Sequence, residues 1–455
     1  MKKPNILLFN NKKLAISYLA ILLSSISLGI TRFLFPLRFI ELGGSEALVS
    51  LASLVFSIGQ LFGIFIVSKL LDRTGFDFLI GISSWVLFIA LPIIPWYPIM
   101  FIAKFFEGLG YGVLTIVVLN ISSVEVKERI SEAIGTLLGA VFLGNALGQG
   151  LGGLMKTYLF SFWNFSGKFT SLQMSFLFGL MIIVIPLIIS TIQSLNIRKT
   201  LSPKDRISLN HFHFKDIKKL FLIPSFVFML ILYGLYDFSH GLYTPNLLVM
   251  FTNSGFTEAE TGLIFFIGDA VWGLSQIFTG KLADRLGNWL PITFSVMLKG
   301  LGVLFYPLAK GVIFLGIAFI IVGFAEALME PARNCEVLTI EDKIKADINS
   351  EDTNHHHKHI NFSYTRGRGM VLGIHAHYHQ HGIDKELILG IFQIVGIISF
   401  GIGGSIGSLL LVLSITLETI TYIGSGIIFA NIILGIIGII ITRKEKTKCQ
   451  IEEKI

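Results

Sequence analysis

Nine ionisable side chains interrupt the long apolar segments of this chain: Arg32, Lys104, Glu107, Asp237, His240, Asp269, Lys299, Glu326 and Glu330. A charge inside a bilayer is costly, and those that are kept there usually bind an ion, a proton or a polar ligand. The candidates for a central cavity that binds a ligand or a proton are Asp269, Arg32, Glu107, Lys104, His240 and Asp237.

Asp269 is the strongest of these candidates. It precedes Asp284, which stands in a polar turn, by about four helical turns. At about 1.5 Å per helical residue, this separation places it roughly 22 Å into a bilayer. Two interpretations are open: Asp269 binds a proton or a cationic group, or it forms a static pair with a lysine such as Lys299.

The other intramembrane charges also have two readings. Arg32 and His240 precede Pro36 and Pro245 at near-equivalent places in two segments, and they either line a cavity or reach the outer surface. Glu107 follows Lys104 by three residues, on one helical face, so the two side chains could simply neutralise each other. Glu326 and Glu330 also share a face, and we expect Glu330, next to Pro331, near a helix end.

A short polar turn occurs twice. Residues 68–75 read SKLLDRTG and residues 280–287 read GKLADRLG, with almost half the chain between them. Such a repeat between apolar segments indicates two homologous halves around a shared centre. The acid can neutralise a helix terminus, and the glycine permits a tight reversal. We therefore expect an inner gate at Asp72, Arg73, Gly75, Asp284, Arg285 and Gly287.

The bulk composition is that of a membrane protein. The chain is 455 residues long, 53% hydrophobic and 14% charged, whereas soluble proteins carry about 25% charged residues. Apolar segments long enough to span a bilayer lie at about 14–40, 47–67, 78–95, 98–120, 134–158, 172–194, 220–250, 260–280, 289–308, 311–332, 387–413 and 416–442.

The basic residues predict the orientation. With the N-terminus inside, 29 of the 36 Lys and Arg residues lie in cytoplasmic segments and four lie outside. This bias places both termini in the cytoplasm, in a multi-pass protein of the plasma membrane. It also explains the net charge of +7 without nucleic acid. We expect a monomer whose partners are the lipid bilayer, a small-molecule substrate and protons.

The two halves differ by one insertion. Gly144, Gly148 and Gly152 correspond to Ser399, Gly403 and Gly407 later in the chain. Fewer residues separate the two copies of the turn than separate each of these first-half residues from its second-half counterpart. The second half must therefore contain extra residues after its copy of the turn, and we expect this insertion at about 340–385. The predicted parts are a first bundle (1–194), a connecting loop (195–219), a second bundle (220–442) and a tail (443–455).

The predicted insertion is rich in histidine. It contains His355, His356, His357, His359, His375, His377, His379 and His381. Imidazoles suit Zn²⁺, Ni²⁺, Co²⁺ and Cu²⁺. The segment either binds such metals weakly or is a low-complexity insertion without a metal role. No cofactor is otherwise expected.

The chain resembles the major facilitator superfamily over essentially its whole length. GKLADRLG is very close to the signature loop of that family, and Ser68, Phe76 and Asn288 depart from it. Residues 104–110, KFFEGLG, resemble a subgroup pattern that carries a basic residue linked to proton coupling. The glycines around Gly148 are similar to the antiporter motif of the family, with Gln149 in place of its proline.

The resemblance implies an all-α membrane protein with twelve transmembrane helices in two pseudo-symmetric six-helix bundles. It implies a secondary transporter with alternating access, similar to the drug–proton antiporters. We expect proton-coupled export of a small molecule. The alternatives are an exporter of divalent nickel, cobalt or zinc that uses the histidine-rich loop, and a non-transporting membrane sensor. We expect no enzyme, because no nucleophile–base pair stands in a polar pocket.

Overall fold

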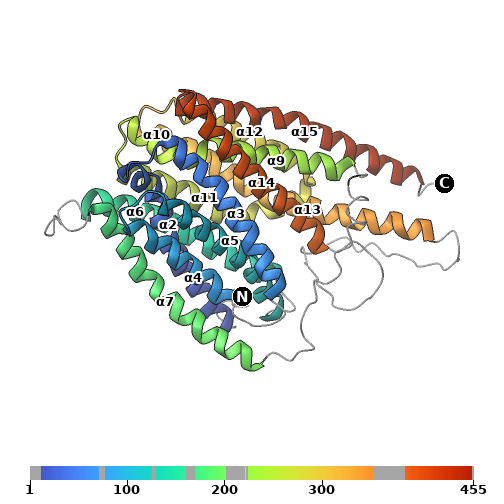
Figure 1. The fold of residues 1–455 in the computed structure, drawn as a ribbon. Helices are drawn as coiled ribbons and strands as arrows, with labels where there is room; N and C mark the ends of the chain where they lie inside the picture. Colours follow the sequence, from blue (N-terminus) through green and yellow to red (C-terminus); the bar gives the residue numbers. More distant parts are fainter. Residues whose placement is uncertain are drawn as a thin grey trace, which may run out of the picture.

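The computed structural model describes residues 12–70, 77–125, 130–159, 170–200, 221, 224–352 and 385–452. These residues form helices and turns, and no strand occurs among them. Figure 1 shows the long helices running side by side. We call the end at which α2 begins and α15 ends the terminal end, and the opposite end the distal end.

The first half contains six membrane-crossing segments. They are α2 (Lys12–Glu41), α3 (Glu46–Leu70), α4 (Asp77–Ala90) with the 3₁₀ turn η1 (Leu91–Ile93), α5 (Ile99–Glu125), α6 (Ile130–Leu154) with the π-helical turn η2 (Met155–Leu159), and α7 (Ser171–Thr200). Pro92 lies within the 3₁₀ turn, because proline cannot donate the hydrogen bond that would continue α4.

The second half repeats this arrangement. Its segments are α9 (Pro224–Tyr243), η4 (Thr244–Asn246) and α10 (Leu247–Asn253) as one interrupted crossing, then α11 (Glu258–Leu286), α12 (Trp289–Phe305), α13 (Val312–Asp352), α14 (Lys385–Val412) and α15 (Leu417–Glu452). The interruption falls at Pro245.

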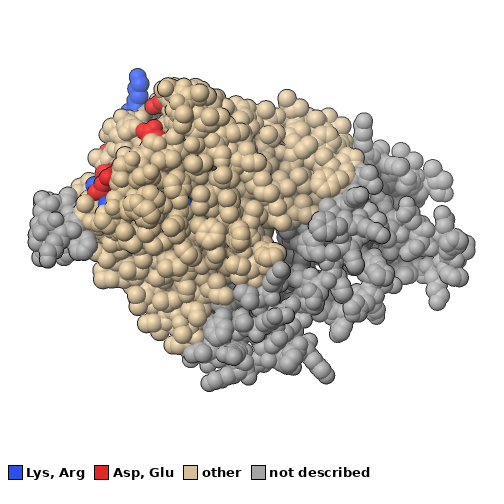
Figure 2. All heavy atoms as spheres, viewed as in Figure 1, with Lys and Arg blue, Asp and Glu red and all other residues tan. Residues whose placement is uncertain are grey.

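The helical surface matches a lipid environment. Within the described residues, seven helices are long and apolar enough to cross a membrane, and two shorter helices are also apolar. Large apolar side chains are exposed on the outside, among them Ile313 and Phe278. In Figure 2 the charged side chains visible on this face gather at the distal end, and the broad side of the described part is uncharged.

The two halves pack by the same pattern. In the first half α2 packs on α6 and α7, and α4 packs on α5 and α7; in the second, α9 packs on α14 and α15, and α12 packs on α13 and α15. The α3–α5 contact corresponds to the α11–α13 contact in the same way. The halves meet where α6 packs on α11 and α3 packs on α14. This pairwise match confirms the internal duplication.

Equivalent glycines make equivalent contacts. A Cβ atom on Gly148 of α6 would overlap the carbonyl oxygen of Ile26 on α2. A Cβ atom on Gly403 of α14 would overlap the carbonyl oxygen of Phe238 on α9 in the same way. Only glycine allows these helices to approach so closely. The alignment of the two glycine patterns therefore has a structural basis.

One expectation about α13 needs correction. The helix continues through Pro331 to Asp352, so Glu330 does not lie near a helix end. Residues 340–352 continue this helix, and the rest of the predicted insertion up to residue 384 lies outside the described residues. An apolar helix of a membrane protein can extend into water as a polar helix, and hydropathy alone marks only the apolar part.

Candidate functional site

A buried carboxylate with two cations lies within the first half. Glu107 on α5 is fully buried. Its Oε1 atom lies 3.2 Å from Arg32 Nε on α2, and its Oε2 atom lies 2.5 Å from Lys104 Nζ. Lys104 and Glu107 therefore do neutralise each other, and Arg32 leaves this cluster with one excess positive charge. Arg32 therefore lies against α5, where Glu107 and Tyr111 bind it.

Aromatic rings surround these cations. Lys104 Nζ lies 4.4 Å from the ring centroid of Phe35, and the Arg32 guanidinium lies 5.3 Å from that of Tyr111. Arg32 Nη1 and Asn145 Nδ2 both donate to the Tyr111 hydroxyl, at 3.2 and 3.0 Å. Cation–π contacts of this kind stabilise a cation away from water.

The second half contains another buried lysine–glutamate pair, with its two residues on different helices. Lys299 on α12 is fully buried, and its Nζ atom lies 2.6 Å from Glu326 Oε1 on α13 and 3.4 Å from the ring centroid of Tyr236. Because α13 corresponds to α5, Glu107 and Glu326 occupy matching helices. Lys299 pairs with Glu326 and not with Asp269, so the static pair considered for Asp269 does not form.

Asp269 lies on the interface between the halves. Its Oδ2 atom accepts a hydrogen bond of 2.9 Å from Gln149 Nε2 on α6. Arg32 is near enough to interact electrostatically with Asp269, but among the described residues the two form no ion pair. The sequence signal for Gln149 was its place in the antiporter motif, where it replaces a proline, and we did not predict it as a site residue.

Asp237 and His240 lie where α9 packs on α14. A Cβ atom on Gly396 would overlap Asp237 Oδ2, so this carboxylate lies directly against α14. The His240 ring lies parallel to Tyr243 at 5.9 Å and edge-on to Phe400 at the same centroid distance. His240 therefore packs inside the protein among aromatic rings.

A third polar group lies nearer the terminal end. Gln276 Nε2 on α11 donates a hydrogen bond to Glu330 Oε2 on α13. The Arg333 guanidinium, one turn further along α13, lies 4.3 Å from the ring centroid of Tyr233. Glu326 and Glu330, which we expected to share one helical face, thus have different partners.

The second copy of the repeated turn joins α11 to α12. Asp284 and Arg285 lie in the last turn of α11, and Gly287 has a φ of +81°, which favours glycine. Glu336 on α13 is 3% exposed and accepts hydrogen bonds from Trp289 Nε1 (2.8 Å) and Asn288 Nδ2 (2.9 Å). Glu336 holds this turn, and no sequence pattern had singled it out. Asp72, Arg73 and Gly75 of the first copy lie outside the described residues.

The halves are tied together at the distal end. Asn246 Nδ2 donates to Ser50 Oγ at 2.6 Å, and Asn253 Nδ2 donates to Glu46 Oε1 at 3.1 Å. On the other side of the molecule, Lys156 Nζ lies 3.8 Å from Glu258 Oε1. These contacts hold the two halves together at the distal end in this conformation.

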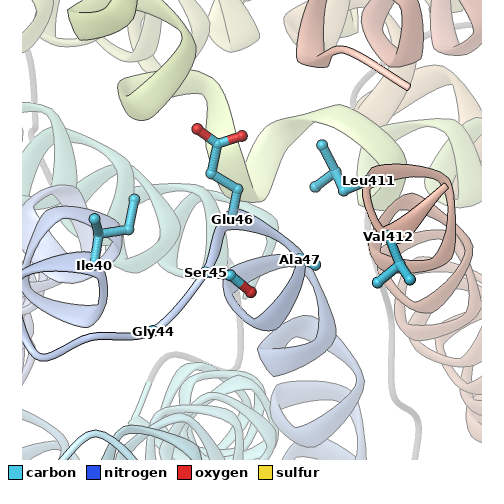
Figure 3. Close-up of a pocket in the computed structure, with 7 residues that line it drawn as sticks. All are labelled: Ile40, Gly44, Ser45, Glu46, Ala47, Leu411 and Val412. Carbon is cyan, nitrogen blue, oxygen red and sulfur yellow. The ribbon is translucent and has the colours of Figure 1, made fainter. Parts of the chain in front are cut away.

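A surface hollow at the distal end lies apart from the buried charges. Figure 3 shows it between the α2–α3 turn and the end of α14, with Ile40 on one side and Leu411 and Val412 on the other. Glu46 is the charged residue in its lining. The hollow contains none of the predicted cavity residues, so it is not the candidate site.

The predicted metal-binding histidines belong to a segment that the structure does not describe. His355, His356, His357, His359, His375, His377, His379 and His381 all lie outside the described residues. Across the part of the chain that is described, no group of three or more His, Cys, Asp or Glu residues could hold a metal ion.

Two matching helical halves with buried charges at and beside their interface are typical of a secondary membrane transporter. The chain belongs to the Major Facilitator Superfamily, whose profile matches residues 17–334. It has the twelve-helix fold of that family. No curated protein sequence matches the chain.

Solved structures of transporters share the fold. The nucleoside transporter NupG superposes with a TM-score of 0.60 at 14% identity, over 94% of this chain and 98% of that one, and a variant of NupG gives 0.66 over 93% and 99%. The human organic anion transporter MFSD10 (TETRAN) gives 0.57 at 14% identity, over 93% and 98%. At this identity the likeness concerns the fold alone.

Proposed function

We propose that this transporter couples proton movement to the export of a small organic molecule, and that Asp269 is the proton-binding group. The observation that carries this proposal is the partner of Asp269. Among the described residues that partner is a neutral amide, Gln149, on the opposite half of the protein.

Three of the buried acids, Glu107, Glu326 and Asp269, differ in what their protonation would cost. A proton on Glu107 would leave Arg32 and Lys104 without their counter-charge, and a proton on Glu326 would do the same to Lys299. An uncompensated buried charge costs about 3–5 kcal/mol. Asp269 forms no such ion pair among the described residues, so its protonation breaks no direct contact with a buried cation.

The place of Asp269 couples its proton to the movement of the halves. The α6–α11 contact must change when the halves rock, and the Gln149–Asp269 hydrogen bond lies on that contact. The amide donor favours the charged carboxylate. Proton uptake therefore weakens a bond between the halves, which links the protonation state to the conformation.

Export and proton antiport are part of the same proposal. They are supported by the resemblance of residues 104–110 and of the α6 glycines to the patterns of proton-coupled exporters. Lys104 lies in the Glu107 cluster, and Gly148 lies at the α2–α6 contact. Arg32, Glu107, His240 and Asp237 are proposed as cavity residues, and the two repeated turns as the terminal gate.

The test is flux in proteoliposomes under an imposed pH gradient, with cationic, zwitterionic, anionic and neutral organic compounds and with Ni²⁺, Co²⁺ and Zn²⁺. Asp269→Asn should lower gradient-driven flux at least about tenfold, which corresponds to about 1.4 kcal/mol in barrier height. Glu260→Gln, which alters an acid in the first turn of the same helix, should leave the flux unchanged. Full proton-driven transport by Asp269→Asn would overturn the proposal.

A further inference from the structure

Five polar or ionisable side chains lie along the α2–α6 and α6–α11 contacts. They are Arg32, Asn145, Gln149, Asp269 and Trp272. Asn145 and Gln149 are four residues apart on one face of α6, and Asp269 and Trp272 are three apart on α11. A Cβ atom on Gly29 of α2 would lie 2.5 Å from the Asn145 carbonyl oxygen, so α2 lies directly against this part of α6.

Two amide oxygens of this cluster are buried without a hydrogen-bond donor. These atoms are Asn145 Oδ1 and Gln149 Oε1, and Asn145 is only 5% exposed. The amide nitrogen of each residue is already used, on Tyr111 and on Asp269. Leaving such a group unsatisfied costs about 1–3 kcal/mol. These two oxygens, one of them on the residue that binds Asp269, therefore suit a ligand with N–H donors.

The two charged residues of this cluster, Arg32 and Asp269, have opposite charges, and each has a hydrogen-bonding atom that is not used in the described part of the protein. The Arg32 side chain is 37% exposed, and its hydrogen bond and ion pair use Nη1 and Nε. Asp269 uses Oδ2 for Gln149. Within the described residues, Arg32 Nη2 and Asp269 Oδ1 have no protein partner. By contrast, Glu107 and Lys299 are fully buried in their ion pairs.

An aromatic surface adjoins the charges. The Trp272 ring lies on the Phe142 ring with a centroid separation of 4.3 Å, and this contact also joins the two halves. On the other side, Phe56 lies below the Arg32 guanidinium and against Phe400 of the second half. A flat ring placed between the halves would find an aromatic face from each of them.

We propose that this site takes a zwitterionic organic molecule that carries a planar ring. Its anionic group binds Arg32, its ammonium group binds ionised Asp269 and the amide oxygens, and its ring packs on Trp272. The inference rests on the proposed function and names the substrate class of that same site. It also explains how the site could exchange substrate for a proton, because the ammonium group of the substrate and the proton compete for the carboxylate of Asp269.

A purely cationic or purely anionic substrate fits this site less well. A cation would satisfy Asp269 but bring a second positive charge beside Arg32. An anion would satisfy Arg32 but bring a negative charge beside Asp269. A molecule with both charges meets both side chains, and each charge-assisted hydrogen bond is stronger than a neutral one.

The test is binding to the purified full-length protein in detergent, measured by thermal stabilisation without a pH gradient. The probes are two matched sets. One contains tryptophan, tryptamine and indole-3-propionate, and the other contains phenylalanine, phenethylamine and 3-phenylpropionate. Within a set the zwitterion should bind at least about tenfold more tightly than either singly charged analogue, a difference of about 1.4 kcal/mol.

Two variants test which side chain binds which charged group of the ligand. Asp269→Asn should remove the advantage of the zwitterion over the acid, and Arg32→Gln should remove its advantage over the amine. Glu41→Gln, which alters an acid at the distal end of α2, should change neither. Binding that follows only the amine, only the acid, or no member of either set would overturn the inference.

The outcomes separate the two proposals. Zwitterion binding that depends on Arg32 and Asp269, with flux that ignores the pH gradient, would support this inference and contradict proton coupling. Proton-driven flux of a singly charged compound would support coupling and contradict this inference.

Discussion

Gln149 on α6 donates a 2.9 Å hydrogen bond to Asp269 on α11, and this bond crosses the interface between the two halves of the protein. It places an amide opposite the intramembrane acid that the sequence analysis ranked first. Because α6 and α11 belong to different halves, the bond can persist only in conformations that keep this part of the interface closed.

Gln149→Leu should shift the protein away from this conformation, in which the two halves are held together at the distal end. The substitution removes a hydrogen bond to a charged group, worth about 1.5–3 kcal/mol. The measurement is the labelling rate of a cysteine introduced at Ser50, in a background with Cys335 and Cys449 replaced by serine. Because that free energy corresponds to a factor of about ten or more in the conformational equilibrium, we expect the labelling rate from the distal side to rise by the same factor.

Asp269→Asn is the matched control for that measurement, because asparagine keeps an oxygen acceptor for Gln149 while it removes the charge. It should raise labelling less than Gln149→Leu does. Equal labelling in Gln149→Leu and the parent protein would show that this hydrogen bond does not hold the interface.

The Lys299–Glu326 pair should be important for stability as a unit. Lys299→Met leaves Glu326 as an unpaired buried charge, which costs about 3–5 kcal/mol. The double variant Lys299→Met with Glu326→Leu removes both charges and should recover most of that loss. Thermal unfolding in detergent measures both, and a double variant less stable than each single variant would contradict the pairing.

Gly153→Ala should disturb the α6–α11 contact. A Cβ atom there would overlap the carbonyl oxygen of Glu258, which forces the helices apart. We expect a severalfold loss of transport. Gly139→Ala is the control, because a Cβ atom at Gly139 of the same helix meets nothing within 4 Å. Alanine stabilises a helix by about 1 kcal/mol relative to glycine, so the control should be neutral or slightly stabilised.

Glu336→Ala should loosen the turn between α11 and α12. It leaves the buried Trp289 Nε1 without its acceptor, at about 1–3 kcal/mol, and it also removes the acceptor of the partly buried Asn288 Nδ2. Asn288→Ala removes only one of the two hydrogen bonds and should have the smaller effect. Protease sensitivity at this turn, measured on membranes with the terminal end accessible, distinguishes the two variants.

Much of the architecture could be predicted from the sequence. The apolar segments, the repeated turn and the matching glycines predicted twelve crossings in two related halves, and the family match and the helix packing confirm this. Helix ends were harder: α13 continues to Asp352 although its apolar part ends near Pro331. Hydropathy reports where lipid contact ends, whereas a helix continues as long as its backbone hydrogen bonds are favourable.

The sequence by itself determined which charges lie in the membrane, because each crossing is a local run of apolar residues and any ionisable group within it is visible. The tertiary structure decided how those charges are paired. Lys299 pairs with Glu326 on the neighbouring helix, Arg32 joins Glu107, and Asp269 meets Gln149 across the interface. These partners come from different helices, and only packing at the glycine contacts fixes which faces meet.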